Sequence, residues 1–379
     1  SFDDEPQQLY RANVLDYISY LRTVKGLSNR SVNAKLASLH SFNLYLIAAG
    51  YTKEVVLDKQ DYLKVQLAYA SPSTVSREEV ERFRQEILEH CGVRDYAIVT
   101  ILAYTAIAGA VGAGITESVM VSSFGTSSVD MMIVRESEAP SCRFTYCGGA
   151  AKDSIVPGYL GIESGQAAFG DAFEWLKNFL LWPLSSAPDE KRRGELSAQL
   201  IERLSAEAEK RPFFHKVYGL DWLNGRRYPH PDEQVRGLLG GLSLATDPVD
   251  VFIALAQASV FGLRRIADSF LDCGFSIQKV IATGGIAQRS PYIMQLTADI
   301  LQQPVEVPQV KEVTALGTAI YAAVGAGLYP SVSAAQKSMC SRHMLRYDPA
   351  PSRRAAADVM YARYREAGRT AGATAALLF

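Results

Sequence analysis

Two glycine-containing turns hold the residues of this chain best suited to binding phosphate. The first, Gly125-Thr126-Ser127, lies between two apolar stretches. Because Gly125 has no side chain, backbone N–H groups can close on an anion there, and the Thr126 and Ser127 hydroxyls add donors. A glycine in such a place is more often ordinary turn geometry, so this turn by itself is a weak signal for a phosphate site.

The second turn, Gly284-Gly285, follows the apolar residues 280–282 and precedes a predicted helix. With no side chain in the way, a flat base or a phosphate can lie against the backbone. The N-terminus of the helix favours negative charge at the same point. Each turn alone is weak, but both together in one strand-and-helix unit predict a nucleotide site.

The predicted secondary structure changes near residue 105, from helices alone to alternating strands and helices. Before it, apolar residues recur at helical spacing, which predicts helices over 9–21, 28–50, 58–69, 76–91 and from 95 onward. After it, short apolar strands (119–121, 131–134, 280–282 and 305–307) alternate with helices (166–181, 194–210, 249–273, 291–301 and 315–327). This order predicts an α/β domain with its ligand at the turns, preceded by a small all-α domain.

Several segments after residue 109 have the order and spacing of motifs in a known protein family: 157–166, 169–176, 220–229, 284–291, 302–307 and 315–319. Together they resemble the C-terminal half of the FGGY-type carbohydrate kinases, most closely the ribulokinase type, from about residue 109 to about residue 364. The resemblance implies an actin-like, ribonuclease-H-type domain. Such a domain holds ATP and Mg²⁺ against a second lobe that carries the sugar.

The resemblance also implies roles for individual residues. Residues 125–127 match a loop that approaches the ATP phosphates. Gly284 and Gly285, with Gln288 in the following helix, match residues that hold the adenosine. Glu163 matches a carboxylate that contacts hydroxyls of a ribulose-type sugar. Without the resemblance, Glu163 is instead a charge near the N-terminus of a helix.

One departure from the family pattern concerns the catalytic base. The family carries its catalytic aspartate a few residues before the stretch that matches 112–115, yet no carboxylate occurs here between Asp95 and Glu117. Loss of a general base costs roughly 10²–10⁴ in rate. The sugar-binding lobe that should precede this stretch has no match either. The sequence therefore predicts impaired phosphoryl transfer, with no catalytic residue and no metal ligand assigned.

The first hundred residues resemble a different family. Segments 14–22, 25–28 and 41–46 resemble the core-binding domain of tyrosine recombinases (integrases), and 76–80 and 94–105 resemble the start of their catalytic domain. Between Asp16 and Glu54 every charged residue is basic: Arg22, Lys25, Arg30, Lys35 and Lys53. These cations predict contact with DNA phosphates, with Arg22, Lys25, Arg30 and Lys35 as the binding residues; the alternative is a solvated helical face. The family's first catalytic arginine is missing after Thr105.

Both resemblances end at residues 105–106, which predicts a fusion. The expected parts are an all-α recombinase-like domain over 1–72, the start of a recombinase catalytic domain over 73–105, and a kinase-like ATP-binding domain over 106–379. The expected function is a ribulokinase-like module that binds nucleotide, and a pentulose-type sugar if a complementary lobe is supplied. The alternatives are a DNA-binding module carried by residues 8–70 and a partly folded product without function.

The composition excludes a disordered or low-complexity protein. With 48% hydrophobic residues in 379, the chain can bury a large core, and its net charge of −1 gives no global attraction to nucleic acid. Residues 96–116 lack charge, but their glycines favour a buried helix that runs into a turn over a membrane span. Five widely spaced cysteines and a polar start predict unpaired thiols, a cytoplasmic location and no membrane partner.

Overall fold

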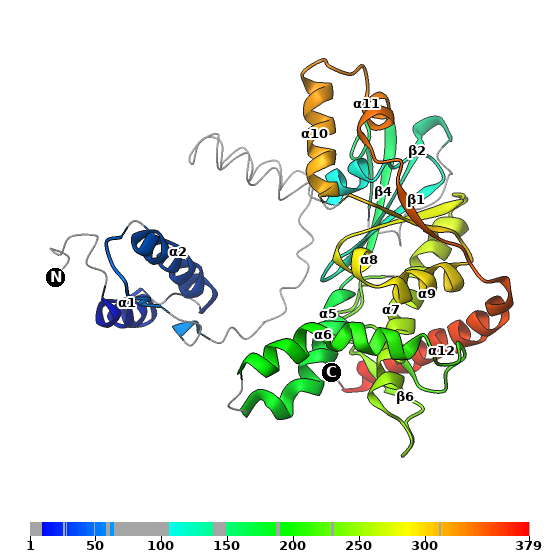
Figure 1. Cartoon of the computed structure of the whole chain (residues 1–379). Coiled ribbons are helices and arrows are strands. Elements are labelled where there is room, and N and C mark those ends of the chain that lie inside the picture. The colour runs from blue at the N-terminus through cyan, green and yellow to red at the C-terminus, as the bar shows by residue number, and fades with distance from the viewer. Residues whose placement is uncertain are drawn as a thin grey trace. The chain divides into compact units, whose positions relative to one another are not determined.

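The computed structural model describes residues 10–25, 27, 29–48, 50–57, 61–63, 106–138, 149–186, 190–228, 231–310 and 312–378. The chain divides into two compact units, Ser1–Thr74 and Val75–Phe379 (Figure 1). Each unit has its own hydrophobic core, and each is described by itself below.

The first unit contains two helices, α1 (Arg11–Thr23) and α2 (Asn29–Ala48). Val14, Ile18 and Leu21 recur along one side of α1, as helical spacing requires, and pack in a buried cluster with Val32 and Leu36 of α2. Both helices confirm the predicted ones. The expected helices over 76–91 and from 95 to 105 lie outside the described residues, as does most of the helix expected over 58–69.

The second unit is built on a seven-stranded mixed sheet, in the order β3-β4-β2-β1-β7-β8-β9. Its strands are β1 (Val119–Phe124), β2 (Ser128–Arg135), β3 (Gly149–Lys152), β4 (Tyr159–Gln166), β7 (Lys279–Thr283), β8 (Val305–Pro308) and β9 (Met344–Tyr347). β7 pairs parallel with β1 and β8, and the other pairs are antiparallel. A separate two-stranded ribbon joins β5 (Tyr218–Leu220) and β6 (Leu238–Gly240).

Side chains on successive strand residues enter two different cores, because strand residues alternate between the faces of a sheet. Val280 and Ala282 of β7 belong to the larger core, whereas Ile281 belongs to the smaller one. Met132 and Met131 of β2 divide in the same way. Helices therefore cover both faces of the sheet.

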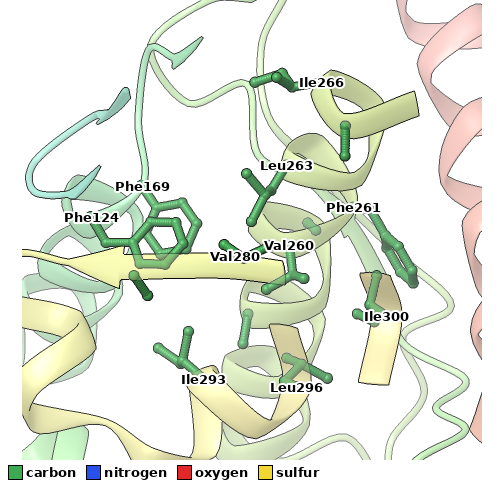
Figure 2. Close-up of a cluster of buried hydrophobic side chains, with 14 of the residues drawn as sticks. Phe124, Phe169, Val260, Phe261, Leu263, Ile266, Val280, Ile293, Leu296 and Ile300 are labelled. Atoms are coloured by element: carbon green, nitrogen blue, oxygen red, sulfur yellow. The ribbon is translucent and has the colours of Figure 1, made fainter. Parts of the chain in front are cut away.

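The larger core is covered by α5 (Gly170–Leu181), α6 (Glu190–Ala208), α7 (Pro248–Asp272), α9 (Pro291–Leu301) and α12 (Arg354–Leu378). The smaller core is covered by a helix over 106–112, α10 (Val313–Gly325) and α11 (Val332–Met339). The short helices are α8 (Gly285–Arg289), η2 (Glu136–Glu138), η3 (Trp182–Ser186) and η4 (Pro351–Arg353). α7 is the central helix of the larger core, and Val260, Leu263 and Ile266 project from it among the buried residues in Figure 2.

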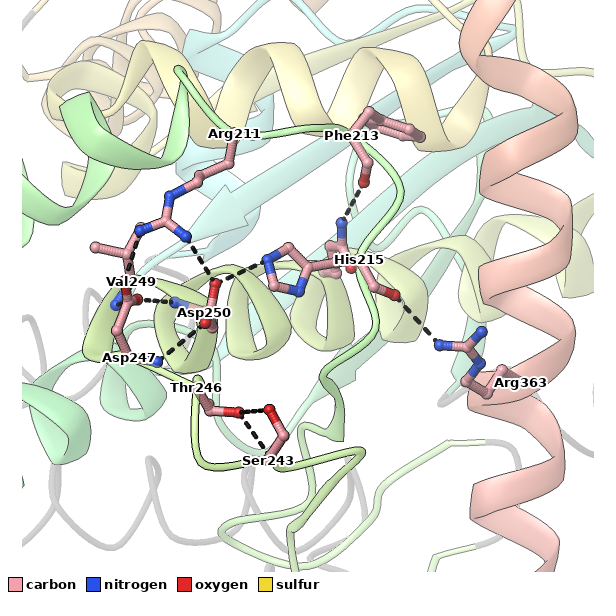
Figure 3. Close-up of polar contacts among 10 residues, drawn as sticks. Arg211, Phe213, His215, Ser243, Thr246, Asp247, Val249, Asp250 and Arg363 are labelled. Carbon is pink, nitrogen blue, oxygen red and sulfur yellow. Dashed lines mark hydrogen bonds and ion pairs between the residues drawn. The ribbon is translucent and has the colours of Figure 1, made fainter.

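A polar cluster fixes the start of α7. The Asp247 side chain accepts hydrogen bonds from the amides of Val249 and Asp250. The Asp250 side chain in turn accepts a hydrogen bond from the Asp247 amide, which completes a capping box. Arg211 forms ion pairs with both carboxylates, at 2.5 and 3.2 Å, and His215 contacts Asp250 at 3.1 Å (Figure 3). This cluster ties the segment after α6 to the N-terminus of α7.

The strands and helices expected after residue 106 are confirmed in type, with one error. Gln166 does not begin a helix but ends β4, and α5 begins at Gly170. β4 is not predicted from residue propensities, because it contains Gly161 and Gly165 and glycine is a poor strand former. Both glycines are required by contact, since a Cβ at either would lie 2.3 Å from another residue's oxygen. β3, β5, β6, β9, α8, α11 and α12 were also not predicted.

The uncharged stretch 96–116 is described from residue 106 onward. Its described part is the helix over 106–112 and a glycine turn, with Val111 and Ile115 fully buried in the smaller core. Across the described ranges, no helix is both long and apolar enough to cross a membrane. The described part therefore agrees with a buried helix that runs into a turn.

Two of the cysteines differ in their bonding, since one is a free thiol and the other forms a disulfide. Cys340 carries a free thiol whose Sγ lies 3.4 Å from the Gly112 carbonyl oxygen, and burial raises its pKa to about 11. Cys273, directly after α7, is disulfide-bonded. The expectation of unpaired thiols is therefore wrong for Cys273.

Candidate functional site

The two glycine turns lie side by side at one edge of the sheet. β1 and β7 run parallel and pair in register, with Ser123 opposite Thr283, so both strands end at the same edge. Gly284 then approaches Phe124 so closely that a Cβ would lie 2.4 Å from the Phe124 carbonyl oxygen. Its φ of 90° is also one that only glycine adopts without strain. The sequence predicted each turn, and the fold brings them together.

The carbonyl groups of the first turn point toward α5. The turn closes through a hydrogen bond from the Gly125 amide to the Ser127 carbonyl, at 3.0 Å. The Thr126 carbonyl accepts bonds from two amides at the start of α5, and the Gly125 carbonyl accepts a third; the donors are Phe169 (2.8 Å), Asp171 (3.1 Å) and Gly170 (2.9 Å). The start of α5 therefore fixes the orientation of both peptide groups.

The amides of Thr126 and Ser127 are left for another partner. Within the described part of the chain, neither amide donates to a backbone carbonyl. Gly125 and Thr126 are exposed, and Ser127 is half-buried. Two neighbouring N–H groups on an exposed turn, with two hydroxyls beside them, are the donors that an oxyanion requires. The residues present therefore fit a phosphate group.

Aromatic packing holds the first turn against α5. The rings of Phe124 and Phe169 stack with their centroids 4.4 Å apart, and both are fully buried (Figure 2). A Cβ at Gly170 would lie 2.4 Å from the Gly125 carbonyl oxygen and 3.2 Å from Ile286 Cδ1. The sequence marks residues 169–176 as a family motif but does not place them in the site, because the contact of Gly170 with Gly125 exists only in the folded chain.

The second turn exposes Gly284 and Gly285 at the start of α8. Gln288 is also exposed, but its side-chain Nε2 donates to the Pro308 carbonyl at 2.8 Å. That bond ties α8 to the end of β8. The structure therefore gives Gln288 a structural contact, and its predicted contact with adenosine remains a prediction.

A buried polar chain lies directly behind the first turn. Ser128 bonds to Asp130 and to Gln166, and Gln166 bonds in turn to Asp221. Burial raises the pKa of Asp130 to about 7 and that of Asp221 to about 6, although hydroxyl and amide donors lower both. Tyr364 of α12 donates to Asp221 at 2.7 Å. Sequence analysis did not identify this network, because its members come from four distant segments.

Glu163 lies in the middle of β4, with Met131 and Gly149 as its neighbours on the adjacent strands. It is exposed, and surrounding protein raises the pKa of its carboxyl while the charge of Arg227 lowers it. Three strand residues, roughly 10 Å, separate Glu163 from Gln166 at the base of the first turn. The alternative reading of Glu163 as a helix N-terminal charge is wrong, because α5 begins only at Gly170.

The predicted DNA-binding cations lie in the first unit. Arg22 and Lys25 are exposed at and just after the end of α1, and Lys35 is exposed on α2. Arg30 also lies in α2, but its side chain is outside the described residues. The Lys25 Nζ is 5.8 Å from the centre of the Tyr20 ring. Arg22, Lys25 and Lys35 thus reach solvent from a two-helix unit.

Among the described residues, no group of three or more His, Cys, Asp or Glu side chains could hold a metal ion. The amides of the first turn are hydrogen-bond donors and therefore suit phosphate oxygens, whereas the oxygens of the Thr126 and Ser127 hydroxyls are of the kind that can also ligate a cation.

Comparison with protein families and sequences gives a consistent result. The model of the C-terminal domain of the FGGY family of carbohydrate kinases matches residues 120–326. The ribulokinase of Vibrio parahaemolyticus is 36% identical over 267 residues, which is 69% of this chain and 47% of that protein. The ribulokinase of Anoxybacillus flavithermus is 32% identical over 258 residues, 67% of this chain and 44% of that protein. The chain thus spans about half the length of these relatives.

Solved structures show the same fold. The xylulose kinase of Rhodospirillum rubrum superposes with a TM-score of 0.57 at 23% identity, covering 71% of this chain and 51% of that one. The glycerol kinase of Plasmodium falciparum, solved with ADP, gives 0.53 at 19% identity, covering 69% and 49%. The expected actin-like, ribonuclease-H-type fold is confirmed.

Proposed function

The chain belongs to the FGGY family of carbohydrate kinases, and we propose that residues 106–379 act as its nucleotide-binding module, of ribulokinase type, with ATP and Mg²⁺ as ligands. The observation that carries this proposal is the position of the two glycine turns. Strands β1 and β7 end together and place the Thr126 and Ser127 amides, which donate to no backbone carbonyl of the described residues, beside the exposed backbone of Gly284. The similar glycerol kinase structure was determined with ADP.

In the proposed complex, the Thr126 and Ser127 amides and hydroxyls bind phosphate oxygens, and the nucleoside lies along Gly284 and Gly285. Phosphoryl transfer depends on positioning and on neutralising the charge that spreads over the phosphate oxygens. When Mg²⁺ is bound with the nucleotide, it supplies part of that neutralisation. The chain's own contribution is a rigid turn, because its carbonyls are fixed by α5 and its rings are packed.

The proposed second substrate is a pentulose-type sugar of the ribulose kind. The two relatives reported above are both named ribulokinase, and Glu163 offers an exposed carboxylate that can accept bonds from sugar hydroxyls. The Arg227 charge favours the ionised form of Glu163, the form that accepts such bonds. A complementary lobe would supply the remaining sugar contacts.

The proposed turnover is slow. The family's catalytic aspartate has no counterpart here, because no carboxylate occurs between Asp95 and Glu117. Without a base to take the proton of the attacking hydroxyl, the rate falls by roughly 10²–10⁴. We therefore expect ATP binding to be measurable where ribulose phosphorylation is weak.

Calorimetric titration of the full chain with ATP and Mg²⁺ tests the proposal. We expect saturable heat with the wild type and a large loss of affinity with Gly284→Ala, whose methyl group would collide with the Phe124 carbonyl. The matched control is Gly158→Ala. Gly158 has nearly the same φ, +88°, but no atom of the described residues lies within 4 Å of its Cβ position.

If backbone strain alone mattered, both variants would lose affinity equally. The proposal requires that Gly158→Ala keep wild-type affinity. Absence of binding heat in the wild type at millimolar ATP would refute the nucleotide-binding function.

A second candidate function, for the first unit, is DNA binding by a recombinase-like domain. The observation that favours it is the exposure of Arg22, Lys25 and Lys35, in a segment whose charged residues are all basic. We expect retention on duplex DNA that falls steeply with salt, and a smaller salt slope in the triple variant Arg22→Ala, Lys25→Ala, Lys35→Ala. Retention that ignores both salt and the substitutions would exclude phosphate binding by this surface.

A further inference from the structure

The buried polar chain behind the first turn begins with one shared hydroxyl. Ser128 Oγ lies 3.2 Å from Asp130 Oδ2 and 3.1 Å from Gln166 Oε1, and it accepts a bond from the Gln166 amide at 3.2 Å. All three residues are buried. Ser128 directly follows the turn and pairs with Phe124 across it, so this hydroxyl sits at the base of the phosphate-binding hairpin.

The orientation of the Gln166 side chain follows from its other contacts. Its Nε2 lies 2.9 Å from Asp221 Oδ2 and 2.8 Å from the Ser259 carbonyl oxygen. Both of these atoms are acceptors, so they take the two amide hydrogens. The Oε1 atom is then the one that faces Ser128, and it can only accept a hydrogen bond.

The Ser128 hydroxyl has too few hydrogens for the acceptors around it. The Ser128 hydroxyl has one hydrogen but faces two acceptors, Gln166 Oε1 and Asp130 Oδ2. If Asp130 is ionised, one of these buried acceptors goes without a donor, which is costly in a dry interior. If Asp130 Oδ2 carries a proton, Asp130 donates to Ser128 and Ser128 donates to Gln166. Each of these bonds then has one donor and one acceptor.

The surroundings of Asp130 favour the neutral acid. Ser122 faces it from β1 and Ser164 from β4, while the titratable group acting on it from β4 is Glu163, whose charge has the same sign. Among the described residues, Asp130 Oδ1 and Ser122 Oγ have no hydrogen-bond partner of ordinary geometry, although the nearby Ser122 hydroxyl lowers the pKa of Asp130 against the larger effect of burial. Beyond Gln166 the next titratable groups are Asp221 and Tyr364, and neither supplies a positive charge. Burial raises the pKa of Asp130 to about 7, in agreement with the count of hydrogens.

We infer that Asp130 is a positioning residue, and that the proton on its carboxyl completes the hydrogen bonds that hold the 125–127 hairpin in its phosphate-binding form. Loss of this proton draws the Ser128 hydrogen to Asp130 and removes the bond from Ser128 to Gln166. The base of the hairpin keeps its strand pairing with β4 and the bond from the Gln166 amide, but it loses the side-chain bond that leads through Gln166 to Asp221 and α12.

Infrared spectroscopy of the full chain tests the proton directly, without a nucleotide. The wild type should show the carbonyl stretch of a buried protonated carboxylic acid, lost with a midpoint near pH 7. Asp130→Asn should remove that signal, because its amide donates to Ser128 without titrating. Asp221→Asn should keep it, and so should the exposed control Asp348→Asn.

A wild type without the component that titrates near pH 7, or such a component that survives Asp130→Asn, would overturn the inference. The buried acid of Asp221, whose pKa is about 6, gives a separate component that Asp221→Asn removes. Should Asp130→Asn fail to fold, Ser128→Ala provides the second variant. The Ser128 bond lowers the pKa of Asp130, so its removal must move the midpoint to higher pH. An unchanged midpoint would contradict the assignment.

The consequence for the ligand rests on the proposed function. If ATP with Mg²⁺ binds only the protonated form, its affinity falls by up to about tenfold between pH 6 and pH 8 in the wild type. Asp130→Asn should bind with the same affinity at both pH values. An equal fall in both proteins would contradict the positioning role. If the infrared signal of the protonated acid titrates but the chain binds no nucleotide, the proposed function is refuted and the assignment of the proton to Asp130 is not.

Discussion

At the residue scale, the site depends on positions where a side chain cannot fit. Gly284 and Gly170 each bring their backbone so close to the first turn that a Cβ would lie 2.4 Å from a carbonyl oxygen. Gly284 could be predicted from the sequence because it follows an apolar strand in a Gly-Gly pair. Gly170 could not be, because its constraint comes from Gly125, 45 residues earlier, and is visible only in the folded chain.

Two buried carboxyl groups make stability depend on pH. The pKa of Asp130 is raised to about 7 and that of Asp221 to about 6, so the folded chain holds protons that the unfolded chain releases above about pH 4. Their contribution is present below pH 4 and is lost as the pH rises through 6 and 7. Each group contributes a slope of up to about 1.4 kcal/mol per pH unit.

Denaturant unfolding between pH 4.5 and 8 measures this slope. We expect Asp130→Asn to flatten it between pH 5 and 7, relative to the wild type and to the exposed control Asp348→Asn. A slope that is the same in all three proteins would show that Asp130 is ionised throughout this range.

At the element scale, the 106–112 helix and α10 cross with their backbones in close approach. A Cβ at Gly317 would lie 1.7 Å from the Ala108 carbonyl oxygen, and one at Gly112 would lie 1.9 Å from the Val313 carbonyl oxygen. The two backbones are therefore in direct contact, without intervening side chains.

Gly317→Ala should therefore destabilise the second unit by about 2–4 kcal/mol, because the helices must separate to admit the methyl group. Gly325→Ala is the matched control. Gly325 lies in the same helix, and in the part of the chain that the structure describes no atom comes within 4 Å of its Cβ position, so the substitution should be neutral or stabilising by up to about 1 kcal/mol. Equal effects of both variants in urea unfolding would mean that helix propensity, and not the crossing, decides the outcome.

The cap of α7 offers a second test at this scale. Asp247→Ala removes the side chain that accepts from the Val249 and Asp250 amides and pairs with Arg211 (Figure 3). We expect a loss of about 1–2 kcal/mol in unfolding free energy. Asp247→Asn keeps the cap without the charge and should lose less. Equal losses in the two variants would assign the stabilisation to the ion pair with Arg211, which both variants remove.

Elements with a strong local pattern could be predicted from the sequence, and elements fixed by contact could not. α7 reads as an apolar helix over nearly its true length, and β7 as a buried strand before a glycine turn. β4 was missed, and its last residue was assigned to a helix, because its glycines hide the strand pattern. Glu163 was named as a site residue, yet its place in mid-strand depends on pairing with β2 and β3.

At the scale of the whole molecule, the chain consists of two units with separate cores. A ligand stabilises only the unit that binds it, by about 2.7 kcal/mol when its concentration is 100 times the Kd. ATP with Mg²⁺ should therefore raise the unfolding temperature of the large sheet unit and leave that of the helical unit unchanged. Scanning calorimetry with and without nucleotide measures both. A shift confined to the helical unit would contradict the assignment of the site.

The central claim is that the two turns at the ends of β1 and β7 bind one nucleotide together. The most direct measurement is a crystal structure of the chain with ATP and Mg²⁺. The account predicts phosphate oxygens within hydrogen-bond distance of the Thr126 and Ser127 amides and the nucleoside against Gly284 and Gly285. Nucleotide bound elsewhere, with both turns left in solvent, would contradict it.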